Sequence, residues 1–368
     1  MPISSVLGSS ALLPAGLGFR NILINGAMQI AQRSTSTTGI TVSSFPTCDR
    51  WELNLSSGGT WTSTQSTDAP SGFSNSLRVQ CTTANASLAT TNNARIWQKI
   101  EGFNVQQLAK GTADSKPVAL SFWVKSFQTG TFICTIDDLV NNRKISASYT
   151  INASATWEKK ILYFVGDTTG TIPSNSNASL MMTWWLAAGP SFQGSSLSTS
   201  WSSGATLSDY ANGQTNVAGS TSNYFQITGV QLEQNFQPTP FEQRPYGVEL
   251  ALCQRYFQTI STGSLSGYNP YWNVALGSGD IRVMYPFKTT MRAVPTVLTT
   301  GGSSLHSFQF RSYNTGVGNY NLEAQTGIFD ANGFFSLSYI STNNSSTTLP
   351  VGNTVGTNNN TVWVSAEL

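Results

Sequence analysis

Charged side chains are scarce in this 368-residue sequence. It holds 19 Lys and Arg against 17 Asp and Glu, which is 10% of the chain and leaves a formal net charge of +2. A nucleic-acid-binding protein needs a basic surplus or clustered Lys and Arg to replace the counterions of phosphates, and neither occurs here. Coiled coils and helical bundles are excluded as well, because they are rich in Ala, Glu, Lys, Leu and Arg.

Other absences narrow the class further. The sequence has no run of 18 or more apolar residues and no signal-peptide pattern at its start, so we expect no membrane insertion. The four cysteines, Cys48, Cys81, Cys134 and Cys253, match no zinc or redox spacing, and we expect them to be small buried hydrophobes. The single histidine, His306, is accompanied by no Gly-x-Ser-x-Gly motif, so we expect no Ser-His-Asp or Cys-His catalytic group.

Uncharged polar residues and strand-like runs fill the chain instead. Ser (49), Thr (44) and Asn (29) are abundant, while 39% hydrophobic and 11% aromatic residues are enough to bury a core. In Val118–Lys125, apolar residues alternate with others, which places Trp123 and Lys125 on the less apolar face. Similar short runs recur between Ser, Thr, Asn and Gly clusters. This pattern predicts an all-β fold with an antiparallel β-sandwich or jelly roll.

Two segments depart from the strand pattern. Residues 247–257 carry apolar side chains at helical spacing and follow a proline-rich passage, so we place a domain boundary near residue 246. Residues 247–368 then return to short strands and form a smaller β domain after the one at 19–246. The segment Gly26–Arg33 is compatible with a turn or with a strand.

A series of short motifs occurs in a fixed order along the chain. They are Phe19–Arg33, Asp49–Trp51, Gln98–Gly102, Ser121–Ser126, Thr156–Lys160, Gly166–Gly170, Ile227–Glu233, Thr239–Tyr246, Glu249–Phe257, Met291–Val297 and Ser365–Leu368. In this order they resemble a family of tailed-bacteriophage virion proteins that includes fibre and appendage tips. The resemblance extends from about residue 18 to residue 368.

The resemblance implies an architecture and partners. It implies a jelly roll like that of a carbohydrate-binding module, a small β-sandwich head and a homotrimer located in the virion. Residues 1–18 read as an extended docking arm, whose apolar residues would contact other virion proteins by strand addition. These docking residues are Leu7, Leu12, Leu13 and Leu17. Two placements stay open, a short fibre or spike on the tail and a decoration or head-fibre protein on the capsid.

Acidic residues offer an enzymatic alternative. A polysaccharide-degrading enzyme needs two carboxylates at a set separation, and Asp137 and Asp138 are the candidates. Adjacent strand residues face opposite ways, so we interpret this pair as part of a solvated turn and expect no enzyme. We further expect Asp49–Arg50 and Glu242–Arg244 to be structural charge pairs. No cofactor is expected, and a structural Ca²⁺ held by acids and carbonyl groups is left open.

Aromatic residues among polar ones suggest contact with sugars. A glycan site needs flat rings for the apolar faces of sugars and Asn, Gln, Ser and Thr for their hydroxyl groups. Trp184 and Trp185 should point to opposite faces of one strand, so one of them can be exposed. The candidate glycan-binding residues are Trp61, Trp123, Trp184, Trp201 and Trp272. We therefore predict a non-enzymatic phage virion protein that contacts host surface polysaccharide.

Overall fold

The computed structural model describes residues 19–261, 273–276, 280–299, 309–312, 316–319, 329–330, 334–340, 355–356 and 361–368. Leu7, Leu12, Leu13, Leu17, Trp272 and His306 lie outside these residues. The predictions made for those six positions therefore stay predictions.

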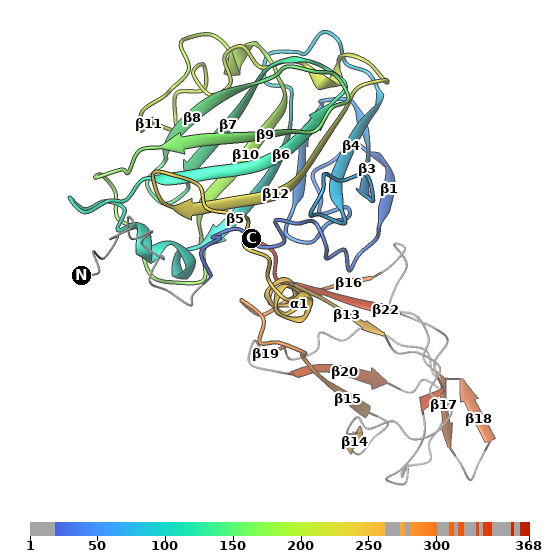
Figure 1. Cartoon of the computed structure of the whole chain (residues 1–368). Coiled ribbons are helices and arrows are strands. Elements are labelled where there is room, and N and C mark those ends of the chain that lie inside the picture. The colour runs from blue at the N-terminus through green and yellow to red at the C-terminus, as the bar shows by residue number, and fades with distance from the viewer. Residues whose placement is uncertain are drawn as a thin grey trace, which may run out of the picture.

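Two six-stranded sheets form the larger part of the molecule (Figure 1). In spatial order, sheet A contains β1 (Ser36–Ile40), β3 (Thr60–Ser66), β4 (Ser76–Thr83), β12 (Tyr224–Gln234), β6 (Val118–Ser126) and β9 (Glu158–Phe164). Sheet B contains β11 (Ser202–Ser203), β8 (Arg143–Ile151), β7 (Gly130–Asp138), β10 (Ala178–Ala188), β5 (Asn93–Glu101) and β2 (Glu52–Ser56). All neighbouring strands in both sheets are antiparallel, which confirms the predicted all-β jelly-roll sandwich.

The core lies between the two sheets and follows strand alternation. In β6, Val118, Leu120, Phe122 and Val124 are buried in this core, as predicted. Trp184 is in the core as well, whereas the neighbouring Trp185 belongs to a second cluster on the outer face of sheet B. All four cysteines are free and buried, which also confirms their prediction.

Irregular segments cover part of each outer face. Residues 189–216, which include η2 (Pro190–Phe192), place Phe192 and Ala211 against Trp185 over sheet B. On sheet A, Thr228 Oγ1 donates to the Asn75 carbonyl oxygen at 2.7 Å, so the 67–75 loop lies over β12. On the outer side of sheet A, β6 presents the half-buried Trp123 and Lys125, and β9 presents the exposed Lys159, Ile161 and Tyr163.

The remaining elements lie beside the jelly roll. Helix α1 (Tyr246–Gln254) confirms the predicted helix and lies between the jelly roll and the C-terminal strands in Figure 1. Three small sheets among the described residues follow it. The first contains β13 (Phe257–Ser261), β22 (Thr361–Ser365) and β16 (Thr296–Thr299). The second contains β14 (Asn273–Leu276), β15 (Asp280–Pro286), β20 (Phe334–Ile340) and β19 (Phe329–Asp330), and the third contains β18 (Gly316–Asn319), β17 (Gln309–Ser312) and β21 (Val355–Gly356). Two further 3-10 turns are η1 (Gly102–Leu108) and η3 (Val217–Gly219). No helix in the described ranges is long and apolar enough to span a membrane.

The junction between the jelly roll and the end of the chain is a buried charge network. Glu367 accepts hydrogen bonds from Arg50 and, at 3.1 Å, from Arg33, and the three side chains are at most 7% exposed. Arg50 also stacks on the Tyr256 ring at 3.5 Å and donates to the Lys99 carbonyl oxygen. Because each guanidinium group has several partners, the end of the chain is fixed to the base of the jelly roll.

Most motifs that carry the family resemblance meet at this junction. The Glu249 carboxylate of α1 accepts from the Asn25 backbone N–H, and Arg255 forms a bidentate pair with Glu101 at 2.8 and 2.9 Å. The predicted Glu242–Arg244 pair is present at 3.2 Å and is confirmed. The motifs therefore encode how the parts of the chain are joined.

The predicted Asp49–Arg50 pair is wrong. Asp49 lies 3.9 Å from Arg33, and Arg50 pairs with Glu367 instead. Burial raises the pKa of Asp49 to about 6, against the lowering effect of Arg33 and of hydrogen bonds from Gln32. Gly26–Arg33 contains a turn and no strand, and Gly26 packs so closely that a Cβ would lie 2.1 Å from the Val230 carbonyl oxygen.

Candidate carbohydrate-binding surface

A half-buried tryptophan marks the open part of sheet A. Trp123 points outward from β6, opposite Thr228 of β12 and Lys159 of β9 in the register. Residues directly opposite in an antiparallel pair share a face of the sheet, so Lys159 lies beside the indole. No hydrogen bond of the Trp123 indole N–H is found among the residues that the structure describes. The ring is thus partly exposed, and its donor has no partner within the described part of the chain.

A second tryptophan is fixed at the edge of this surface. The Trp157 indole donates to Asp68 Oδ1 at 3.1 Å, and Lys125 Nζ donates to Asp68 Oδ2 at 2.8 Å. Partial burial would raise the pKa of Asp68, but the hydrogen bonds from Lys125 and Trp157 lower it below its usual range. Asp68 is therefore ionised at neutral pH and orients both neighbours.

Strand β9 completes the surface with exposed side chains. Ile161 is 40% exposed and Tyr163 is 56% exposed, and both alternate with the buried Leu162 and Phe164. Lys159 precedes them on the same side of the strand and is exposed. We call the outward side chains of Asp68, Trp123, Lys125, Trp157, Lys159, Ile161 and Tyr163 the Trp123 face.

The other predicted tryptophans have different surroundings. Trp61 and Trp184 are 0% exposed in the core, so the prediction that they contact glycan is wrong. Trp61 is also held by a hydrogen bond to the Gly58 carbonyl oxygen at 3.0 Å. Trp201 is half-buried, but its indole donates to the Val165 carbonyl oxygen at 2.7 Å. Its contact with glycan stays a prediction.

Trp157 and Trp97 are partly exposed, although neither was among the predicted glycan-binding residues. Trp157 was overlooked because its partner Asp68 is 89 residues away in the sequence. Trp97, on the outer face of sheet B, donates to Glu52 at 2.6 Å and lies between Arg95 and Lys99, whose charged groups are 4.6 and 5.6 Å from its ring centre. Arg95 and Lys99 therefore already occupy part of the Trp97 ring surface.

The adjacent acids Asp137 and Asp138 are buried, not solvated. The solvated turn predicted for them is wrong, because their exposed fractions are 7% and 1%. The turn itself exists, since Asp138 Oδ1 accepts from the Val140 and Asn141 backbone N–H groups. Burial raises the pKa of Asp137 to about 6, although a hydrogen bond from Tyr210 opposes the rise. The two carboxylates are on opposite faces of β7, as expected for neighbours in a strand.

A lysine ammonium group occupies the oxygen cluster beside Asp138. Lys110 Nζ lies 2.5 Å from Asp138 Oδ2 and 3.0 Å from Asp167 Oδ2, and it donates to the carbonyl oxygens of Thr169 and Gly170. Across the described residues, no group of three or more His, Cys, Asp or Glu side chains is suited to a metal ion. A structural Ca²⁺ stays a prediction.

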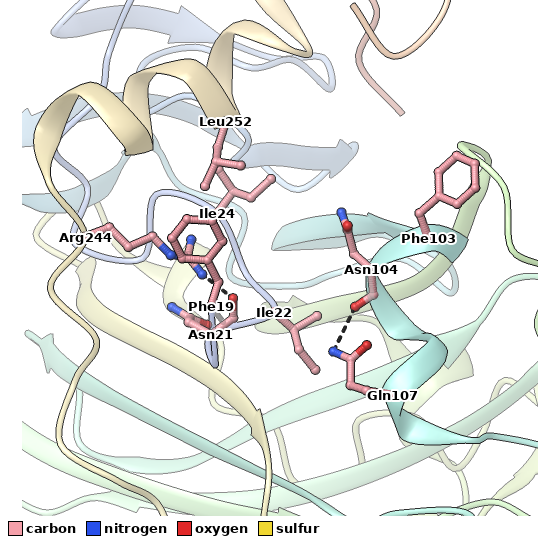
Figure 2. Close-up of a pocket in the computed structure, with 9 residues that line it drawn as sticks. All are labelled: Phe19, Asn21, Ile22, Ile24, Phe103, Asn104, Gln107, Arg244 and Leu252. Carbon is pink, nitrogen blue, oxygen red and sulfur yellow. Dashed lines mark hydrogen bonds between the residues drawn. The ribbon is translucent and has the colours of Figure 1, made fainter. Parts of the chain in front are cut away.

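A cavity of about 400 Å³ lies near the base of the jelly roll (Figure 2). Phe19 and Phe103, which are 58% and 53% exposed, stand on opposite sides of it in the figure. Arg244 fixes the Phe19 ring by lying 4.8 Å from its centre and donating to the Asn21 carbonyl oxygen. The remaining lining residues are Asn21, Ile22, Ile24, Asn104, Gln107 and Leu252. The lining combines apolar and polar side chains and contains none of the predicted tryptophans.

Comparisons with known proteins give distant structural likenesses. No protein-family model matches the sequence, and no curated protein matches it. The enzymatically active domain of tailspike protein 4 of bacteriophage CBA120 is 14% identical, with a TM-score of 0.29 over 58% of this chain and 21% of that one. This chain therefore spans about a fifth of the tailspike chain.

Two carbohydrate-binding modules are similarly distant. The family 11 module of Clostridium thermocellum, solved with a mixed-linked β-1,3-1,4 tetrasaccharide, is 12% identical with a TM-score of 0.29, over 56% of this chain and 99% of that one. TmCBM61, solved with β-1,4-galactotriose, is 10% identical with a TM-score of 0.31, over 59% and 100%. At such low scores, the fold assignment depends on the strand order and register given above.

Proposed function

We propose that this chain is a non-catalytic, glycan-binding protein of a tailed-phage virion. The observation that carries the proposal is the Trp123 face, where a half-buried indole, whose N–H has no hydrogen-bond partner among the described residues, shares one side of the sheet with Trp157 and Tyr163. Sugar rings have apolar C–H faces that pack on indole and phenol rings, and hydroxyl groups that bond to nearby donors and acceptors. The face offers both kinds of contact.

The carboxylates support binding over hydrolysis. Glycoside cleavage needs two carboxyl groups that flank one bond, whereas Asp137 and Asp138 are buried on opposite faces of their strand. Asp138 is also neutralised by Lys110. On the Trp123 face, the carboxylate of Asp68 is engaged by Lys125 and Trp157. These arrangements favour a binding surface without a general acid.

The virion placement is supported by the ordered motifs. Such a protein would form a homotrimer and dock through residues 1–18, presenting the jelly roll to host surface polysaccharide. A short tail fibre or spike is the first placement, and a decoration or head-fibre protein of the capsid is the second. Immunogold labelling of virions distinguishes tail from capsid, and sedimentation tests the trimer, which a clean monomer at micromolar concentration would contradict.

The glycan proposal is tested with Trp123→Ala. If a ligand covers about 50 Å² of the indole, the lost burial at about 25 cal/mol per Å² is about 1.3 kcal/mol, or a tenfold loss of affinity. We expect this loss on an array of bacterial surface polysaccharides followed by titration calorimetry. Phe236→Ala is the control, because Phe236 is 73% exposed but lies in the loop after β12. Unchanged binding by Trp123→Ala, or shortening of the polysaccharide by the wild type, would contradict the proposal.

A further inference from the structure

Lys159 lies beside the Trp123 indole and has no compensating charge in the part of the chain that the structure describes. It pairs directly with Trp123 in the β6–β9 register, so the two side chains leave the sheet on the same face. Lys159 is exposed, and its ammonium group takes part in no ion pair and no cation–π contact among the described residues. The group is therefore available to a ligand that covers the indole.

The neighbouring acids are already neutralised by other cations. Asp68 pairs with Lys125 at 2.8 Å. Glu158 pairs with Lys160 at 2.5 Å and also accepts from Asn152, and this pair is on the other side of β9. Two lysines and one carboxylate thus remain on the Trp123 face, which gives it a net charge of +1 in a chain with few charges.

From this charge balance we infer that the glycan bound by the Trp123 face is acidic, with an anionic group close to the sugar that stacks on Trp123. The inference rests on the proposed function and names its ligand class. The Lys159 ammonium group pairs with the anion, while the indole contacts the apolar side of the ring. A lysine fits this role because its flexible stem moves a point charge to an anion without a fixed bidentate geometry. The anion is a carboxylate or a phosphate, which the experiment distinguishes.

The experiment compares acidic glycans with their neutral counterparts. The probes are polygalacturonate, hyaluronate and polysialate, each also in carboxyl-reduced form, with a sugar-phosphate polymer and neutral dextran and galactan. The wild type is expected to bind acidic members, with affinity that falls as salt rises. If the wild type binds only the sugar-phosphate polymer, the anionic group of the ligand is a phosphate. If it binds the polymers that carry carboxylates and no longer binds their carboxyl-reduced forms, the group is a carboxylate.

Two lysine variants complete the test. Lys159→Gln should weaken binding to acidic glycans about two- to fivefold, the upper part of the range for an exposed ion pair, and should reduce the salt dependence. Lys160→Gln is the matched control, because Lys160 is the next residue but lies on the other side of the strand. It should leave affinity unchanged.

The outcomes separate the inference from the proposed function. Binding of neutral glycans that is lost in Trp123→Ala but unchanged in Lys159→Gln would overturn the inference and keep the proposed function. Equal losses in Lys159→Gln and Lys160→Gln would also overturn it, because the effect would then be one of general charge. Absence of wild-type binding to every probe and to the surface polysaccharide array would contradict the proposed function itself.

Discussion

Removal of the charge on Glu367 should destabilise the protein through two buried arginines. In Glu367→Gln, Arg33 and Arg50 would face an amide in place of a carboxylate, although both are at most 7% exposed. Breaking a buried ion pair by removing one partner costs about 3–5 kcal/mol, because the other charge stays buried without compensation. Gln keeps the shape and can accept a hydrogen bond, so we expect the lower end of this range, about 3 kcal/mol.

The measurement is a thermal unfolding curve at neutral pH. At about 2–4 °C per kcal/mol for a domain of this size, Glu367→Gln should lower Tm by about 6–12 °C. Asp68→Asn is the control, because it breaks an ion pair whose carboxylate is 43% exposed. This control should cost no more than about 1 kcal/mol.

A double-mutant cycle tests the reasoning more directly. If Glu367 acts through Arg33, the double variant Arg33→Gln/Glu367→Gln should lose less stability than the sum of the losses in the two single variants. Additive losses, or equal Tm shifts for Glu367→Gln and Asp68→Asn, would refute the idea that a buried charge network holds the junction.

Two further predictions concern stability. Burial raises the pKa of Asp137 to about 6, so protonated Asp137 stabilises the folded state, and this stabilisation is lost as pH rises from about 4 to 6. Chemical denaturation should therefore show that Asp137→Asn loses less stability than the wild type over that pH range. Parallel curves of stability against pH would contradict this prediction. Gly229→Ala should lower the free energy of unfolding by about 2–4 kcal/mol, because its Cβ would lie 2.5 Å from Phe73 at a φ of +60°. Gly72→Ala is the control, since its Cβ meets nothing within 4 Å, and it should cost about 1 kcal/mol. Equal losses of stability in urea unfolding would rule out the clash.

Strand alternation was readable from the sequence wherever apolar residues mark one face. In β6, Val118 to Val124 specify the core side unambiguously, and Trp123 consequently points outward. Trp184 and Trp185 lie on opposite faces for the same reason. These assignments need only the two-residue period of a strand and no knowledge of partners.

Strands rich in Ser and Thr do not reveal which face is buried. In β3, Trp61 and Ser63 both face inward and are 0% exposed, although the flanking Thr residues are chemically similar to Ser63. Neutral hydroxyl groups can occupy either face if they find a partner, as Ser63 does in Thr47 at 2.8 Å. The sequence alone therefore could not place Trp61.

Long-range partners explain the remaining errors. Asp138 looks like a turn residue, yet Lys110, Asn141 and the covering segments bury it. Trp157 lies outside any strand and is oriented by Asp68 from another part of the fold. Such contacts depend on the topology of the sheets, which local patterns do not specify.

The distance along the chain between the residues of the junction affects the order of folding. Glu367 meets Arg50 and Arg33 across 317 and 334 residues. During synthesis at about 5–20 residues per second, Arg50 waits roughly 15–60 s for its carboxylate partner. A jelly roll that folds during synthesis therefore does so before Arg50 meets Glu367, and closure of the junction is a late step in the folding of each chain.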